Sequence, residues 1–170
     1  MVGSLINAAL AWMHIVSAIV WMGSIVFFTM VLAPVMRNLS PQARAELSIK
    51  MTPKFANFVR LFAILTIVFG LSLVLSLTKG DLAALAPTTI WGIGISGGMT
   101  LTIIAIVLGF GISIPTSQKI VRLTQEMQSN PQSNAMAQIP RLQKRMAMMS
   151  ITILALQFCI VALMVIAARV

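Results

Sequence analysis

The chain has 170 residues, of which 59% are hydrophobic and only 9% are charged. Soluble domains carry about 25% charged residues, so this composition excludes an ordinary soluble protein and indicates an integral membrane protein. The net charge of +9 could suggest a nucleic-acid partner. No nucleic acid is expected, because neither basic loop carries the interleaved aromatic residues of such a surface.

Four apolar runs reach the length of about 20 residues that crosses a hydrocarbon core. They cover about residues 5–36, 58–77, 88–114 and 146–168, and the rest is too short for a soluble domain. The sequence therefore predicts one transmembrane domain over residues 1–170. Its fold class is all-α, an antiparallel four-helix bundle in a lipid bilayer.

The first run spans about 32 residues, so we expect its helix to tilt or its ends to leave the lipid. It has no basic start and is too long for a signal core, so it should stay as an anchor. Pro34 should bend or end this helix. Residues 37–57 are predicted to form a separate amphipathic helix, with Ser40 as N-cap, Pro41 first and Pro53 at its end.

The third run is rich in glycine, and Gly94 and Gly98 have the i, i+4 spacing that lets helices approach closely in lipid. Packing within the chain is favoured over a dimer interface. Pro115 should kink the helix, and residues 117–127 should continue it as a polar segment. Residues 128–140 have the composition of a mobile loop.

Basic residues are distributed unevenly along the chain. Ten of the twelve flank the first and third connections, whereas the second connection has Lys79 with Asp81 and the C-terminus has Arg169. The positive-inside rule therefore places both termini outside, in a protein of the plasma membrane. The basic residues that we expect to set this topology and to hold anionic lipid headgroups include Arg37, Arg60, Lys119, Arg122, Arg141, Lys144 and Arg145.

The only histidine, His14, lies inside the first run. Placing an imidazole in the membrane costs free energy, so ionisable residues there usually have a functional role. His14, Ser17, Trp21, Ser24 and Phe28 follow one another at three- or four-residue spacings and so share one helix face. That face should point into the bundle, where Ser17 and Trp21 find packing partners. Two interpretations stay open: His14 donates a structural hydrogen bond, or it binds a metal or haem.

Thirteen methionines add thioether groups, which together with imidazole suit Cu(I). No H-x-x-M pair occurs on the apolar runs, so a copper site that includes His14 would have to be assembled across helices. Its candidate ligands are His14, Met22, Met99 and Met164. Cys159 is the only cysteine, which excludes an intrachain disulfide, and we expect a buried, inert thiol.

Catalytic constellations are missing from the sequence. The three carboxylates, Glu46, Asp81 and Glu126, lie outside the apolar runs, which argues against a proton antiporter. There is no Walker loop or HExxH, and no second histidine or carboxylate in the apolar runs to pair with His14, so no enzyme is predicted. A single histidine excludes haem with two histidine ligands from one chain, whereas a His/Met haem stays open.

The first helix, WMHIVSAIVWMGSIVFFTMVLAPVM, resembles that of the CopD-like family of membrane proteins. That family's helix reads W-L-H, then W-x-G-G, then a proline near the inner end. Further matches are an arginine at Arg60, a glycine at Gly70 and the ending MVIAAR, so the resemblance spans most of the chain. The matching positions of the first helix are Trp12, His14, Trp21, Gly23 and Pro34.

The resemblance implies copper resistance or uptake, with His14 as the matching histidine. The related membrane protoporphyrinogen oxidase family pairs a similar histidine with a later intramembrane lysine and binds haem. This chain has no lysine within 88–114 or 146–168. The sequence thus favours a copper-handling protein that binds or passes Cu(I) near His14. The alternatives are a non-catalytic subunit of a larger membrane complex or homo-oligomer, and a haem-binding oxidase-like protein.

Overall fold

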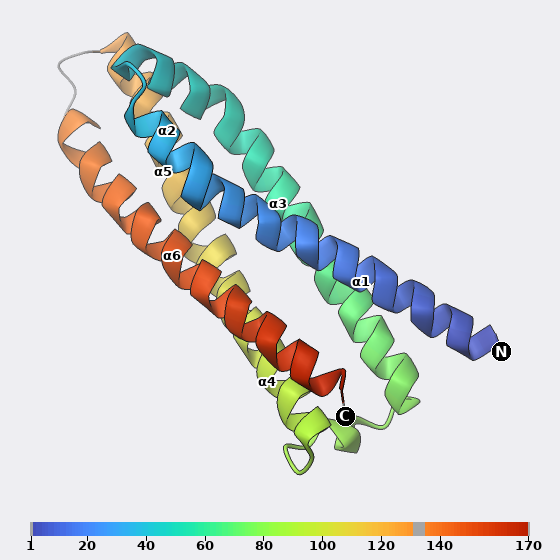
Figure 1. Ribbon diagram of the computed structural model, residues 1–170. Helices are drawn as coiled ribbons and strands as arrows, with labels where there is room; N and C mark the ends of the chain where they lie inside the picture. Colours follow the sequence, from blue (N-terminus) through green and yellow to red (C-terminus); the bar gives the residue numbers. More distant parts are fainter. Residues whose placement is uncertain (1, 131–134, 170) are drawn as a thin grey trace. The chain divides into compact units, whose positions relative to one another are not determined.

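The computed structural model describes residues 2–130 and 135–169, which form helices and turns and no strands (Figure 1). In chain order the elements are α1 (Val2–Phe27), the π-helix η1 (Phe28–Leu32), α2 (Ala33–Arg37), α3 (Pro41–Thr78), the 3-10 helix η2 (Leu82–Leu85), α4 (Ile90–Ile106), the π-helix η3 (Val107–Ser113), α5 (Ile114–Ser129) and α6 (Ala135–Ala167). The all-α class predicted from the sequence is confirmed for these residues.

Four helical segments are long and apolar enough to cross a membrane: Gly3–Arg37, Pro41–Thr78, Ile90–Ser129 and Ala137–Ala167. Each exposes large apolar side chains, and Ile19, Leu61, Ile103 and Ile151 are examples, one from each segment. Water would penalise such surfaces, whereas hydrocarbon solvates them. The protein is therefore an integral membrane protein.

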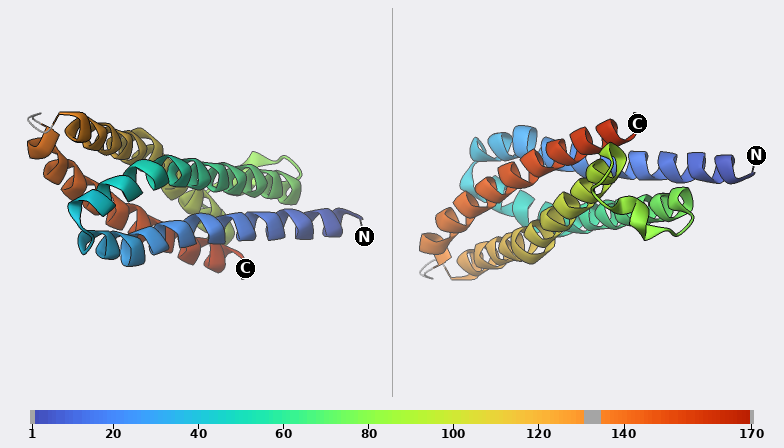
Figure 2. Two further views of the ribbon diagram at one scale, coloured as in Figure 1. Left: turned by 90° about the horizontal axis from the view of Figure 1, so that it is seen from above. Right: turned by 90° about the horizontal axis from the view of Figure 1, so that it is seen from below.

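The chain divides into two compact units, and every spanning segment contributes to both. Unit 1 consists of Met1–Gly23, Leu61–Ala105 and Ala155–Val170, and unit 2 of Ser24–Arg60 and Ile106–Leu154. Ten of the twelve basic residues fall in unit 2. The charge asymmetry of the sequence thus coincides with the division of the fold. Figure 2 gives two further views of the ribbon.

The separate helix predicted for residues 37–57 is wrong, because α3 continues through Pro53 and ends only at Thr78. A proline removes one helical hydrogen bond, and packing at neighbouring positions can outweigh that loss. Here the Phe55 ring, two residues after Pro53, stacks on Phe28 with centroids 5.1 Å apart. The predicted N-terminus is confirmed, since the Ala43 amide donates to Ser40 Oγ at 3.3 Å and the helix starts at Pro41.

Two π-helical segments, η1 and η3, were not expected from the sequence. Each ends two residues before a proline, at Leu32 before Pro34 and at Ser113 before Pro115. A proline ring clashes with the carbonyl four residues earlier, which lies inside the π-helix in both cases, and the wider turn makes room for it. Helical structure therefore continues past both prolines.

The connection between the third and fourth spans is shorter than the loop that the sequence predicts for residues 128–140. The polar continuation after Pro115 is confirmed, because α5 runs to Ser129, while α6 begins at Ala135 and contains Pro140. Residues 131–134 of the predicted loop lie outside the described residues.

Candidate functional site at His14

His14 joins α1 to α3 within unit 1. Its Nδ1 lies 2.8 Å from the backbone carbonyl oxygen of Thr66, and the side chain is half-buried. A carbonyl oxygen can only accept, so Nδ1 carries the proton and donates. In the neutral imidazole, Nε2 then holds a lone pair that is available to a ligand.

Gly70 makes this position of the imidazole sterically accessible. A Cβ atom at residue 70 would lie 2.7 Å from both Cε1 and Nδ1 of His14, closer than side chains approach one another. The ring therefore rests on the bare backbone of α3. Thr66 is itself buried, and its hydroxyl donates to the carbonyl of Phe62 at 2.7 Å.

A second polar contact holds the same two helices together. Ser76 Oγ donates to Asn7 Oδ1 at 2.6 Å. Asn7 meets Ser76 and His14 meets Thr66, so residue numbers fall along α3 as they rise along α1.

The helix face predicted around His14 is partly buried throughout. Ser17 and Trp21 are buried at 4% and 6% exposure, whereas His14, Ser24 and Phe28 are half-buried. Ser24 and Phe28 belong to unit 2, and the other three belong to unit 1. This distribution places the most polar face of α1 away from the lipid-exposed side that carries Ile15 and Ile19.

The other candidate copper ligands, Met22, Met99 and Met164, are half-buried and also belong to unit 1. The Met164 methyl group packs on Gly98, so Met164 belongs to the α4–α6 contact whereas His14 belongs to the α1–α3 contact. Within residues 2–130 and 135–169, no three His, Cys, Asp or Glu side chains are grouped so that they could hold a metal ion.

The two glycines singled out in the third span lie at a close contact between α4 and α6. A Cβ atom on Gly94 would lie 2.7 Å from Ala167 Cβ and 3.0 Å from the Leu163 carbonyl oxygen, and one on Gly98 would meet Met164. Both glycines are buried, and their neighbours belong to the same chain.

Gln157 is a buried polar residue that the sequence analysis missed. Its side chain is 3% exposed, and neither Nε2 nor Oε1 has a hydrogen-bond partner in the described part of the chain. The available signal was its position as the only amide side chain in the last apolar run. Two residues further along α6, Cys159 is exposed, so the predicted buried thiol is wrong. Successive helical residues turn by about 100°, which puts Cys159 on nearly the opposite face.

Replacing Gln157 with leucine is expected to stabilise the protein. The substitution removes two unpaired polar atoms at similar volume, and such a group costs about 1–3 kcal/mol. We expect the melting temperature in detergent to rise by at least about 2 °C. Gln143→Leu is the matched control, because Gln143 is exposed on the same helix and should leave the melting temperature unchanged. A lower melting temperature for Gln157→Leu would show that the amide makes a stabilising interaction.

The site is thus an imidazole held by one backbone hydrogen bond at Nδ1 and one glycine contact. Comparisons of this chain with protein-family models, with curated proteins and with solved structures find no match.

Proposed function

We propose that this chain is a membrane copper-handling protein of the CopD-like type, which binds or passes Cu(I) at Nε2 of His14. The hydrogen bond between His14 Nδ1 and the Thr66 carbonyl carries the proposal. Histidines that bind metals almost always donate their other ring N–H to a carbonyl or carboxylate, which fixes the tautomer and the ring orientation. Gly70 supports this orientation sterically.

The remaining ligands in this proposal are thioethers. Cu(I) is a soft ion that prefers sulfur, and unit 1 holds Met22, Met99 and Met164 together with His14. Methionine has three rotatable side-chain bonds, so its thioether can adapt its position to a soft ion. We assign no enzymatic activity to the chain.

The proposed architecture is an antiparallel four-helix bundle with both termini outside the plasma membrane. Two sets of contacts support it, because residue numbers rise along one helix while they fall along its partner. Asn7 meets Ser76 and His14 meets Thr66. Gly94 meets Ala167 and Gly98 meets Met164. The concentration of basic residues around the first and third connections supports a cytoplasmic position for those connections. His14 then lies in the outer half of the membrane.

The test is a Cu(I) titration of the detergent-purified chain in competition with a chromophoric chelator. His14→Ala is expected to weaken Cu(I) binding by at least about tenfold, equivalent to 1.4 kcal/mol. Met13→Leu is the matched control, because Met13 is the neighbouring residue but is exposed, and its loss should not change the affinity.

Equal affinities of the wild type and His14→Ala would contradict the proposal, as would an absence of Cu(I) binding. A Soret band in the purified protein that disappears in His14→Ala would instead assign the histidine to haem. Stoichiometric co-purification of other chains without Cu(I) binding would support a non-catalytic subunit of a larger complex.

A further inference from the structure

The two helical hairpins of unit 2 use their basic residues differently. In residues 24–60, three of the five basic side chains have partners: Lys50 pairs with Glu46 at 2.6 Å, Arg44 donates to two backbone carbonyls, and Arg60 lies 6.0 Å from the centre of the Phe110 ring. The other two are exposed and make no side-chain hydrogen bond or ion pair with the described residues; they are Arg37 and Lys54. In residues 106–154, five basic side chains share the hairpin with one carboxylate, Glu126. None of these five makes a hydrogen bond or ion pair with the described residues; they are Lys119, Arg122, Arg141, Lys144 and Arg145.

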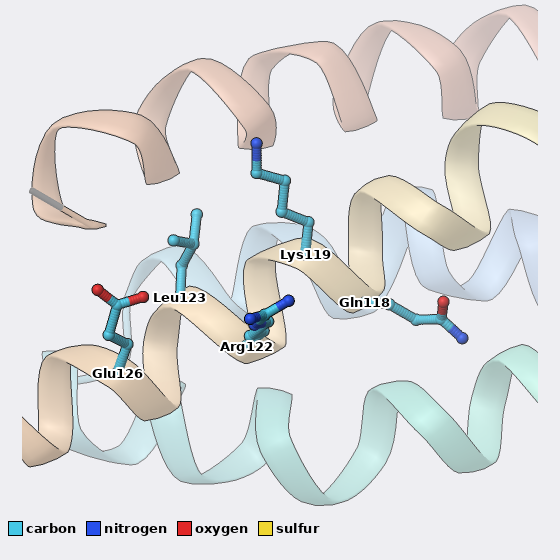
Figure 3. A pocket seen from close by; sticks show the side chains of 5 residues that line it. All are labelled: Gln118, Lys119, Arg122, Leu123 and Glu126. Carbon is cyan, nitrogen blue, oxygen red and sulfur yellow. The ribbon is translucent and has the colours of Figure 1, made fainter.

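An open pocket lies beside two of these unpaired cations. It has a volume of about 460 Å³ and is lined by Gln118, Lys119, Arg122, Leu123 and Glu126 of α5. Figure 3 shows Lys119 extending from α5 toward α6, with Glu126 at one end of the row of lining side chains and Gln118 at the other. A phosphate group would bind near Lys119 and Arg122 and avoid the carboxylate.

Helix α6 also carries a cation at a similar distance from the connection between α5 and α6. Lys119 lies ten residues before the end of α5, and Arg145 lies ten residues after the start of α6. Both helices rise by about 1.5 Å per residue, so these two positions are about equally far from the connection between the helices. Each of the two helices therefore carries a cation at about this distance from the connection.

An apolar stripe continues from the cations along α6. Lys144, Met148 and Ile151 follow one another at spacings of four and three residues, so they share one helix face. Met148 and Ile151 are 57% and 62% exposed. A ligand that fits this surface has an anionic head and an apolar tail.

We propose that the hairpin of α5 and α6 binds one anionic phospholipid, with its phosphate at Lys119 and Arg122 and an acyl chain along Met148 and Ile151. This site lies in unit 2 and does not depend on the copper proposal for His14 in unit 1. A general attraction of the basic surface to anionic membranes would involve all exposed cations alike. The site instead requires the unpaired cations of this one hairpin.

The test measures the thermal stability of the full chain in detergent during titration with phosphatidylglycerol, phosphatidylcholine or inorganic phosphate. Phosphatidylglycerol is expected to raise the melting temperature of the wild type, and the other two additives are not. The double variant Lys119→Gln and Arg122→Gln should weaken the apparent affinity for phosphatidylglycerol by about tenfold or more.

The matched control is Arg37→Gln with Lys54→Gln, which removes the same charge from exposed cations of the other hairpin. This control should keep the affinity of the wild type, and Lys119→Arg should keep it because the charge remains. Equal losses in both double variants would overturn the proposal in favour of diffuse attraction. An equal response to phosphatidylcholine would overturn it in favour of a nonspecific lipid effect, and an equal response to inorganic phosphate would indicate a soluble-anion site.

Discussion

Replacing Gly94 with leucine is expected to destabilise the protein more than any other substitution considered for it. A Cβ atom alone would lie 2.7 Å from Ala167 Cβ and 3.0 Å from the backbone oxygen of Leu163. Neither atom is at the end of a flexible side chain, so α4 and α6 must move apart. Overpacking of this kind costs about 3 kcal/mol, and we expect the melting temperature in detergent to fall by on the order of 10 °C.

The control for this prediction is Gly23→Leu. Gly23 is also in a spanning helix, but it is exposed and an added Cβ would meet no atom within 4 Å. Its leucine variant should melt within about 2 °C of the wild type. Equal melting temperatures for Gly94→Leu and Gly23→Leu would show that the close contact between α4 and α6 does not exist in the membrane protein.

Replacing Gly70 with alanine is expected to weaken Cu(I) binding by about tenfold while leaving the protein folded. The new methyl group would lie 2.7 Å from two atoms of the His14 ring, and the ring can turn away because it is the end of a side chain. Turning breaks the hydrogen bond to Thr66, which contributes about 1 kcal/mol to stability. Loss of such an orienting contact typically lowers metal affinity by about 10–100-fold.

Gly23→Ala is the control here, because the same change on α1 meets no neighbouring atom. In chelator competition, this control should bind Cu(I) with the affinity of the wild type. The melting temperature of Gly70→Ala should fall by no more than about 4 °C. Unchanged Cu(I) affinity in Gly70→Ala would show that Gly70 does not position the His14 ring for metal binding. The contact with Gly70 would then no longer support Nε2 as the ligand atom. If Gly70→Ala fails to fold, Thr66 and Gly70 would have a larger structural role than one hydrogen bond.

Several features of the site follow from local patterns in the sequence. The spacing of His14, Ser17 and Trp21 identifies a shared helix face, and the structure buries the last two. The partner of His14 has no such signal, because it is a backbone carbonyl, and every residue carries one. Gln157 stood out only as a single amide in an apolar run, and its burial depends on the neighbouring helices.

The sequence alone determined the four apolar spans and the uneven basic charge, because length, hydropathy and charge are properties of a segment by itself. It also identified the start of α3, since Ser40 acts on the next turn of the chain. Only the tertiary structure decided that α3 continues through Pro53 and that Cys159 is exposed. The contact of His14 with Gly70 is likewise tertiary, because it joins residues 56 positions apart. Such outcomes depend on which helix faces meet, and the residues of one helix do not specify the partner face.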